Sequence, residues 1–549
     1  MKKTLFSITF FIYCLSAIAA AATPPKLIVQ IVVDQLRGDL IGQFRHEFGS
    51  DGFNYLLDHG INYQNAHHPH ALTVTCVGHA TIATGSTPSL HGIVANDWYD
   101  PRKNRLIYCT EDPDNPTLAT IRSKREAPGQ SPRNLTASTF SDELVLAQRG
   151  RAFGVSLKDR SAITLAGHAG KAFWFDKEHG GFVSSRYYYQ QYPNWVDNWN
   201  AAYHPRNETW KLMSERSSYR FAKVRPIQNH FPHFGDTFPH TLGEPSSSTY
   251  YKNLAMTPFA DELTADFAMT LLKKEKLGKT LNKTDYLAVS FSVVDVIGHH
   301  FTPNSLEYED NLKRLDKTIA KLLKIIDAEV GLKNTFLVLT ADHGTTDSPH
   351  WLAENHIPPL PPLNVKHLQQ SMNALLFTRF KLPPQAVLMI NLPYVYLNHP
   401  LLAERALTVS EVAHYLAEML QYDPTLFAIY SLPLRHNQQD WLSKKVEKMN
   451  FTGRSGDLYI VPKAYQDITD LPEIAISHGS PWNYDSYVPL LFVNPDFTPT
   501  RITRLVYTTD IASTLSGLLA IKPPSASIGN PLSEVIHKWD KIAAKAPLP

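Results

Sequence analysis

Residues 27–34 read Leu-Ile-Val-Gln-Ile-Val-Val-Asp, a nearly unbroken apolar run that ends in a carboxylate. Such a run, rich in β-branched residues, is typical of a strand that is buried on both faces of a sheet. Four further apolar runs have the same character, at residues 153–157, 286–294, 335–340 and 487–493. We therefore expect these segments to be strands of one buried sheet.

Amphipathic helical patterns lie between the predicted strands. Residues 259–277 and 306–330 repeat apolar side chains at helical spacing, and Gly278 and Gly331 follow them as stop signals. Apolar strands that alternate with helices predict an α/β fold, in which helices flank both faces of a doubly wound, mainly parallel sheet.

The composition is that of a globular protein without a strong overall charge. The 549 residues are 43% hydrophobic and 19% charged, which excludes a mainly disordered chain. Lys and Arg number 53 against 51 acidic residues, and Lys2 and Lys3 account for the difference. A neutral chain lacks the field that would bind nucleic acid or an acidic membrane. Any anion must therefore be held by a local site.

The N-terminus predicts a cleaved signal peptide over residues 1–22. Two lysines precede the apolar residues 5–18, and small residues follow. This run is too short to span a bilayer comfortably, and no later run reaches the ~18 apolar residues that a spanning helix needs. We expect residues 23–549 to be exported, to the periplasm or beyond. Cys76 and Cys109 remain after cleavage, and the sequence is compatible with either a disulfide or two free thiols.

Acidic residues and histidines follow the predicted strands. Asp34 ends the first strand, Asp295 the third and Asp342-His343 the fourth, and His299 lies four residues after Asp295. Ligands of doubly wound sheets bind beyond the carboxyl ends of the strands, so these side chains are expected at one edge. One Asp after a strand is usually a turn or N-cap residue, but three such segments argue against that interpretation.

A sixth candidate, His478, follows the apolar residues 474–476. The strand-end argument applies least to this histidine. Carboxylates and imidazoles without cysteine suit zinc or a similar divalent ion. Six ligands are enough for two ions with three protein ligands each, which leaves the open positions that a catalytic site requires.

A second set of residues suits a phosphoryl group. Thr75 begins a probable helix, and helix N-termini bind anions. Thr75 is either an N-cap residue or a nucleophile whose hydroxyl a metal ion activates. Asn96 offers an amide, and Lys158 and Arg160 offer two cations directly after a strand, all suited to phosphoryl oxygens.

Together these motifs resemble the alkaline phosphatase superfamily. The likeness rests on Asp34, Thr75-x-x-Gly-His79, Asn96-Asp-Trp-Tyr-Asp, Asp295-Val-Ile-Gly-His299, Thr340-Ala-Asp-His-Gly and His478-Gly. The chain is most similar to the branch with a type I phosphodiesterase/nucleotide pyrophosphatase domain and a threonine nucleophile. Within that branch it most resembles the phosphate-irrepressible alkaline phosphatases, whose Lys-x-Arg pair matches Lys158 and Arg160. The motifs keep the family's order over residues 26–520. Phe301-Thr302-Pro303 departs from the pattern, because the family has a glycine before the proline.

The resemblance implies two zinc ions and a covalent phosphothreonine at Thr75. One ion would be bound by Asp295, His299 and His478, and the other by Asp34, Asp342 and His343. Asn96, Lys158 and Arg160 would contact the transferred phosphoryl group.

Lys158 and Arg160 favour phosphate monoesters, because a monoester has one more non-bridging oxygen than a diester and a charge of about −2. The prediction is a secreted, zinc-dependent alkaline phosphatase that acts on small phosphorylated substrates. The alternative is a nucleotide pyrophosphatase/phosphodiesterase with the same two metals. A sulfatase is disfavoured because Cys76 lacks the Cys-x-Pro-x-Arg context, and an inactive metal-binding protein because every ligand is present.

Two less periodic regions are expected to be cap insertions in the catalytic domain. Residues 171–255 are rich in aromatics, and residues 350–470 are rich in Pro and Leu. Their side chains are expected to bury local apolar clusters; the functional alternative is that they line the leaving-group side of the cleft.

Overall fold

The computed structural model describes residues 23–224, 231, 234–358, 360–434, 439–468 and 474–543. The expected signal peptide lies outside the described residues. Within these ranges, none of the helices combines the length and the apolar character that a membrane span needs.

Across the part of the chain that the structure describes, ten strands form a central sheet in the order β17-β2-β16-β11-β1-β10-β5-β6-β7, and β18 pairs with β2. All five expected strands belong to it: β1 (Leu27–Val33), β5 (Ala152–Ser156), β10 (Asp285–Phe291), β11 (Thr335–Thr340) and β16 (Tyr487–Val493). The remaining members are β2 (Gly60–His67), β6 (Lys171–Phe175), β7 (Phe182–Val183), β17 (Thr500–Ile502) and β18 (Val506–Tyr507).

The sheet is mainly parallel, as expected. β1 runs parallel to β10 and β11, and β5 runs parallel to β10 and β6. β16 is antiparallel to both β11 and β2. The predicted doubly wound α/β fold is confirmed.

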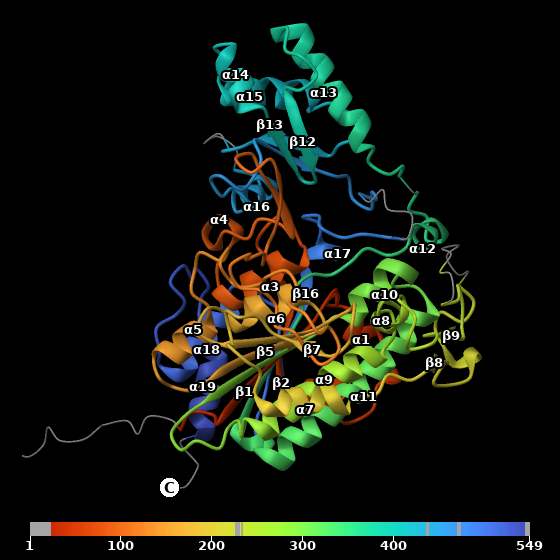
Figure 1. Cartoon of the computed structure of the whole chain (residues 1–549), viewed down its shortest axis with the longest axis vertical. Coiled ribbons are helices and arrows are strands. Elements are labelled where there is room, and N and C mark those ends of the chain that lie inside the picture. The colour runs from red at the N-terminus through yellow and green to blue at the C-terminus, as the bar shows by residue number, and fades with distance from the viewer. Residues whose placement is uncertain are drawn as a thin grey trace, which may run out of the picture.

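Two helix layers cover the sheet. Val29 and Ile31 of β1 pack into an apolar cluster with α9 (Phe259–Lys274) and α11 (Leu306–Glu329). The alternate residues Ile28 and Val32 pack into a second cluster. Helices α5 (Phe140–Leu146), α18 (Asp510–Leu519) and α19 (Ser533–Ala543) are among those that contribute to it. Figure 1 shows these layers on opposite sides of the strands. Because side chains alternate along a strand, the continuous apolar run of β1 serves both layers.

The segment expected as an insertion at 350–470 contains a separate four-stranded sheet. Its strands, in the order β12-β13-β15-β14, are β12 (Val387–Asn391), β13 (Tyr394–Leu397), β15 (Leu458–Val461) and β14 (Ala428–Ser431). They pack against α13 (Val365–Phe380) and α15 (Val409–Leu420) around an apolar cluster of their own. This unit is the upper lobe in Figure 1.

The aromatic segment at 171–255 is built differently from what the sequence suggested. It begins with β6 and β7, which are edge strands of the central sheet. The expectation of a local apolar cluster is wrong for most of its aromatic side chains, because Phe182, Trp210 and Tyr250 lie in the same cluster as α9 and α11.

Acidic residues of α11 hold this segment in place. Asp310 accepts hydrogen bonds from the Trp210 indole at 2.7 Å and from the Met213 amide at 2.8 Å. Glu309 accepts from the amides of Arg220 and Phe221, each at 3.0 Å. These carboxylates satisfy the polar groups of an irregular segment, so that its rings can enter the main core.

The third strand ends earlier than the sequence suggested. β10 stops at Phe291, and α10 (Val293–Phe301) places Asp295 in the first turn of a helix instead of at a strand end. The buried Asp261 carboxylate accepts from the Ser292 amide at 2.9 Å and from the Val293 amide at 3.3 Å. It thereby satisfies donors that the start of a helix leaves free, and it fixes where α10 begins.

Candidate active site

The six predicted ligands meet at the carboxyl edge of the central sheet. Asp34 follows β1, Asp295 and His299 lie on α10, Asp342 and His343 follow β11, and His478 precedes α17 (Asn483–Ser486). Five of the six are buried, and the His299 side chain is 20% exposed.

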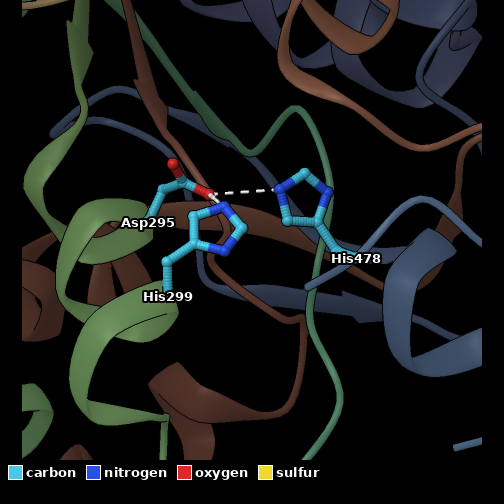
Figure 2. A group of neighbouring side chains, drawn as sticks. All are labelled: Asp295, His299 and His478. Atoms are coloured by element: carbon cyan, nitrogen blue, oxygen red, sulfur yellow. Dashed lines mark ion pairs between the residues drawn. The ribbon is translucent and has the colours of Figure 1, made fainter. Parts of the chain in front are cut away.

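The first group consists of Asp295, His299 and His478 (Figure 2), whose ligand atoms all lie within 4.8 Å of one another. Asp295 Oδ1 is 3.2 Å from His299 Nε2 and 3.3 Å from His478 Nε2. The Nδ1 atoms of the two rings hydrogen-bond to the carbonyls of Ile476 at 2.8 Å and of Thr73 at 2.7 Å. A carbonyl can only accept, so Nδ1 carries a proton in both rings, and the neutral form of each ring directs the lone pair of Nε2 at Asp295.

Burial lowers the pKa of His478 to about 3, so this ring is neutral at physiological pH. Two imidazole lone pairs and a carboxylate that converge on one point fit a divalent cation.

The second group lies beside the first. His343 Nε2 is 3.2 Å from Asp34 Oδ1 and 3.4 Å from Asp342 Oδ2. These three atoms are buried and lie close together, and His79 Nδ1 is also 3.1 Å from Asp342 Oδ2. Burial and the charge of Asp34 raise the pKa of Asp342. Asp34 and His343 also lie within 4.8 Å of a carboxylate oxygen of Asp295, which stands between the two groups. Carboxylates and an imidazole that converge on one point again fit a divalent cation.

Lys158 connects both groups to Thr75. Its Nζ lies 2.5 Å from Asp34 Oδ2, 2.5 Å from Asp295 Oδ2 and 3.5 Å from Thr75 Oγ1. Arg160 Nη2 lies 3.4 Å from the same hydroxyl. The two cations of the predicted pair therefore meet at the candidate nucleophile.

Thr75 is the first residue of α3 (Thr75–Thr84), and Val74 is the N-cap residue. The N-cap interpretation of Thr75 is therefore wrong, and its hydroxyl is available for chemistry. A Cβ on Gly78 would lie 2.0 Å from the Asp342 carbonyl, so only glycine lets the start of α3 approach the ligand loop this closely.

Asn96 and the disulfide brace the start of α3. The Cys76 amide donates to Asn96 Oδ1 at 2.9 Å, which identifies that atom as the oxygen and leaves the NH₂ group at the other end of the amide. Cys76 and Cys109 form a disulfide, which answers the question that the sequence left open. Next to Cys109, the Tyr108 hydroxyl accepts from Arg160 Nη1 at 3.3 Å and donates to Asp159 at 2.8 Å.

Three residues around the ligands were missed by sequence reasoning. Gln35 donates through its amide side chain to Asp295 Oδ1 at 3.0 Å and through its backbone to Asp342 Oδ1 at 3.2 Å. His79 Nδ1 lies 3.1 Å from Asp342 Oδ2 and 2.9 Å from the Thr75 carbonyl. Gln35 directly follows Asp34, and His79 ends the Thr75-x-x-Gly-His79 motif. Their places in the sequence were the signal that could have identified them.

The third missed residue, Asp485, forms hydrogen bonds with the two histidine loops, which carry His343 and His478. Its Oδ2 accepts from the amides of Gly479 and Ser480 at 3.1 and 2.8 Å and from the Ser480 hydroxyl at 2.5 Å. Its carbonyl accepts from the Gly344 amide at 2.7 Å. The rings of His343 and His478 stack with centroids 3.6 Å apart. No sequence motif pointed to Asp485.

The comparison with known proteins agrees with this geometry. The sequence pattern of the type I phosphodiesterase/nucleotide pyrophosphatase family matches residues 28–481. The chain belongs to this family. It is 34% identical to alkaline phosphatase PhoV of Synechococcus elongatus over 93% of each chain. It is 33% identical to alkaline phosphatase PafA of Elizabethkingia meningoseptica over 98% of this chain and 99% of that one.

The crystal structure of wild-type PafA superimposes on this chain with a TM-score of 0.82. The two are 31% identical, and the match covers 94% of this chain and 100% of that chain. The resemblance to the phosphate-irrepressible branch of the alkaline phosphatase superfamily is thereby confirmed. Murine ectonucleotide pyrophosphatase/phosphodiesterase 5, at 15% identity and a TM-score of 0.50, shares the fold.

Proposed function

We propose that this protein is a zinc-dependent alkaline phosphatase that hydrolyses phosphate monoesters through a covalent phosphothreonine at Thr75. The observation that carries the proposal is the position of the Thr75 hydroxyl. It begins a buried helix and lies within 3.5 Å of two cationic side chains, one of which, Lys158, also contacts Asp34 and Asp295 of the two Asp/His groups. The related alkaline phosphatases support the same activity.

In this proposal Asp295, His299 and His478 hold one zinc ion, and Asp34, Asp342 and His343 hold the other. The convergence of these imidazole nitrogens and carboxylate oxygens, with Nδ1 of His299 and of His478 bound to carbonyls, fits this role. When bound, a pair of such ions activates a hydroxyl and a water as nucleophiles and neutralises charge on the leaving oxygen.

The chain's own residues would act as follows. Thr75 Oγ1 loses its proton and attacks phosphorus; as the new O–P bond forms, the bond to the leaving oxygen breaks, and that oxygen takes up a proton and departs as the alcohol. Water then attacks the phosphothreonine, which releases inorganic phosphate and restores the hydroxyl. Free amides at the start of α3, the Asn96 amide and the two cations hold the non-bridging oxygens. Burial opposes the charge of Lys158, but Asp295 and Asp34 outweigh it and raise its pKa, so the ammonium persists.

The second candidate is a phosphodiesterase/nucleotide pyrophosphatase, because the matched family carries that description. It would use the same ligands and Thr75. Lys158 and Arg160 favour the monoesterase, since they suit a third phosphoryl oxygen and a second negative charge.

We further propose that residues 1–22 are a cleaved signal peptide and that the mature enzyme is periplasmic or secreted. The disulfide between Cys76 and Cys109 supports an oxidising compartment.

The test combines metal analysis with trapping of the intermediate. We expect two equivalents of zinc in the purified protein, turnover of phenyl phosphate, and an acid-stable phosphoryl group on Thr75 after rapid acid quench. Thr75→Ala should abolish both turnover and labelling, whereas Thr75→Ser keeps a hydroxyl and should retain labelling at the same position. Full turnover by Thr75→Ala would refute the covalent mechanism.

A further inference from the structure

Lys177 is a third cation at the sheet edge that carries Lys158 and Arg160, and the chemistry above gives it no role. The strand order β1-β10-β5-β6 arranges the chain segments along this edge. Asp34 follows β1, Asp295 follows β10, Lys158 follows β5 and Lys177 follows β6. β5 and β6 are parallel, with Ser156 opposite Trp174, so the residues that follow these two strands leave the sheet side by side. Lys177 therefore lies one strand farther from the acidic ligands than Lys158.

The loop between β6 and β7 holds the backbone of Lys177 in a defined turn. Asp176 Oδ1 accepts from the amides of Glu178 and His179 at 2.8 and 3.1 Å. Backbone hydrogen bonds from Gly180 to Asp176 and from Asp176 to Gly181, at 2.8 and 2.9 Å, close the loop. These contacts fix the place from which the lysine side chain extends.

Lys177 lies among charges of both signs, and those nearest to the transferred phosphoryl group are cationic. Its side chain is half-buried, and Asp159 and Asp295 offset its neighbouring cations only in part. Asp159, the acid nearest in sequence to the phosphoryl-contacting pair, already accepts from the Tyr108 hydroxyl. Burial, together with the charges of Lys158 and Arg160, lowers the pKa of Lys177 to about 8, although Asp159 and Asp295 act in the opposite direction. Three neighbouring cations repel one another, and a bound anion would relieve that repulsion.

We propose that Lys177 binds a second phosphate group of the substrate, one strand along the sheet edge from the phosphoryl group that Lys158 and Arg160 hold. This inference rests on the proposed phosphomonoesterase function. A monoester carries one substituent on the transferred phosphorus, so the second phosphate must belong to the leaving group. The favoured substrates are then small alcohols that carry a phosphate at each end. A lysine ammonium recognises such a group as a point charge.

The test compares two substrates that share one leaving alcohol, propane-1,3-diol monophosphate and propane-1,3-diol bisphosphate. Lys177→Met keeps the length of the side chain and removes its charge. We expect it to lower kcat/KM for the bisphosphate roughly tenfold or more, as for the loss of one charged hydrogen bond. The same variant should change kcat/KM for the monophosphate less than about threefold. Lys177→Arg should keep the preference.

The matched control is Lys171→Met, which removes the same charge from the opposite end of β6, where Lys171 donates to the Tyr188 carbonyl. It should leave the ratio of the two kcat/KM values unchanged. An equal loss on both substrates by Lys177→Met, or no loss on either, would overturn the inference while leaving the monoesterase intact. If the wild-type protein hydrolyses neither substrate but does hydrolyse diesters, the proposed function itself fails.

Discussion

At the scale of single residues, Lys158 and Arg160 are not equivalent members of a pair. Lys158 contacts two buried carboxylates as well as Thr75, whereas Arg160 contacts Thr75 and the Tyr108 hydroxyl. Removing Lys158 alone therefore changes the charge around Asp34 and Asp295 as well as the contact with Thr75, so one substitution combines two effects. Removing Arg160 tests the phosphoryl contact more directly.

We predict that Arg160→Ala lowers kcat/KM for phenyl phosphate roughly 10- to 100-fold, because a hydrogen bond to a charged group contributes about 1.5–3 kcal/mol. The loss for methyl phenyl phosphate should be several-fold smaller, since a diester has one fewer charged oxygen. The double variant with Lys158→Ala should widen the difference. Steady-state kinetics on this matched pair measure it, and equal losses on both esters would contradict the assignment to monoesters.

At the scale of loops and helices, Asp485 sets how the two histidine loops lie together. One of its oxygens, Oδ2, accepts all three hydrogen bonds from Gly479 and Ser480. Burial raises the pKa of Asp485 to about 6, which still leaves the carboxylate mostly ionised at neutral pH, but all three hydrogen bonds go to a single oxygen. One well-placed oxygen is sufficient, and an amide side chain can supply it.

We predict that Asp485→Ala weakens zinc binding about tenfold and lowers the free energy of unfolding by about 1–3 kcal/mol, because it leaves buried donors unpaired. Asp485→Asn should retain most of the zinc affinity. Competition with a chelator of known affinity measures the binding.

The matched control for Asp485 is Asp316→Ala on α11. Asp316 also accepts from two amides, those of Gly49 and Phe53, at 2.8 and 2.7 Å. The control should lose comparable stability without any change in zinc affinity. A parallel loss of zinc affinity in both variants would mean that Asp485 acts only through global stability.

The sequence predicted those parts of the site that depend on periodicity. Continuous apolar runs are visible in one dimension, so the strands and the residues that follow them could be placed, including Asp34 and the pair Asp342-His343. Side chains that act through other side chains could not be found this way. The start of α10 depends on Asp261 of a distant helix, and the position of His478 depends on Asp485. Such hydrogen bonds follow from tertiary packing, which has no local pattern.

At the scale of the whole molecule, the chain leaves the site after His343, builds the upper lobe, and returns to the site at His478 (Figure 1). The stacked rings of these two histidines therefore bring together the two ends of the segment that forms the upper lobe. Metal binding at both groups would hold the two ends of this segment at the central sheet. The stability of the contact between the lobe and the sheet would then depend on metal occupancy.

Buried neutral histidines make the stability of the molecule sensitive to acid. His91 Nδ1 accepts from the Ile93 amide and Nε2 lies 3.2 Å from the Thr81 hydroxyl, so the folded ring binds no extra proton. Burial lowers the pKa of His91 to about 3, and burial together with neighbouring histidines lowers that of His70 well below 6.5. Between about pH 6.5 and pH 3 the unfolded chain takes up protons that the folded chain does not, so stability falls as the pH falls.

We therefore predict that the free energy of unfolding decreases below about pH 6, by up to ~1.4 kcal/mol per pH unit for each such histidine. Above about pH 7 these rings should leave it unchanged. His91→Asn removes one titrating group and should make this slope shallower by that amount. Urea denaturation at pH 7, 6 and 5, with wild-type and variant proteins both stripped of metal, separates the effect from the release of zinc. Identical slopes would show that the His91 ring titrates in the folded protein as it does in the unfolded chain.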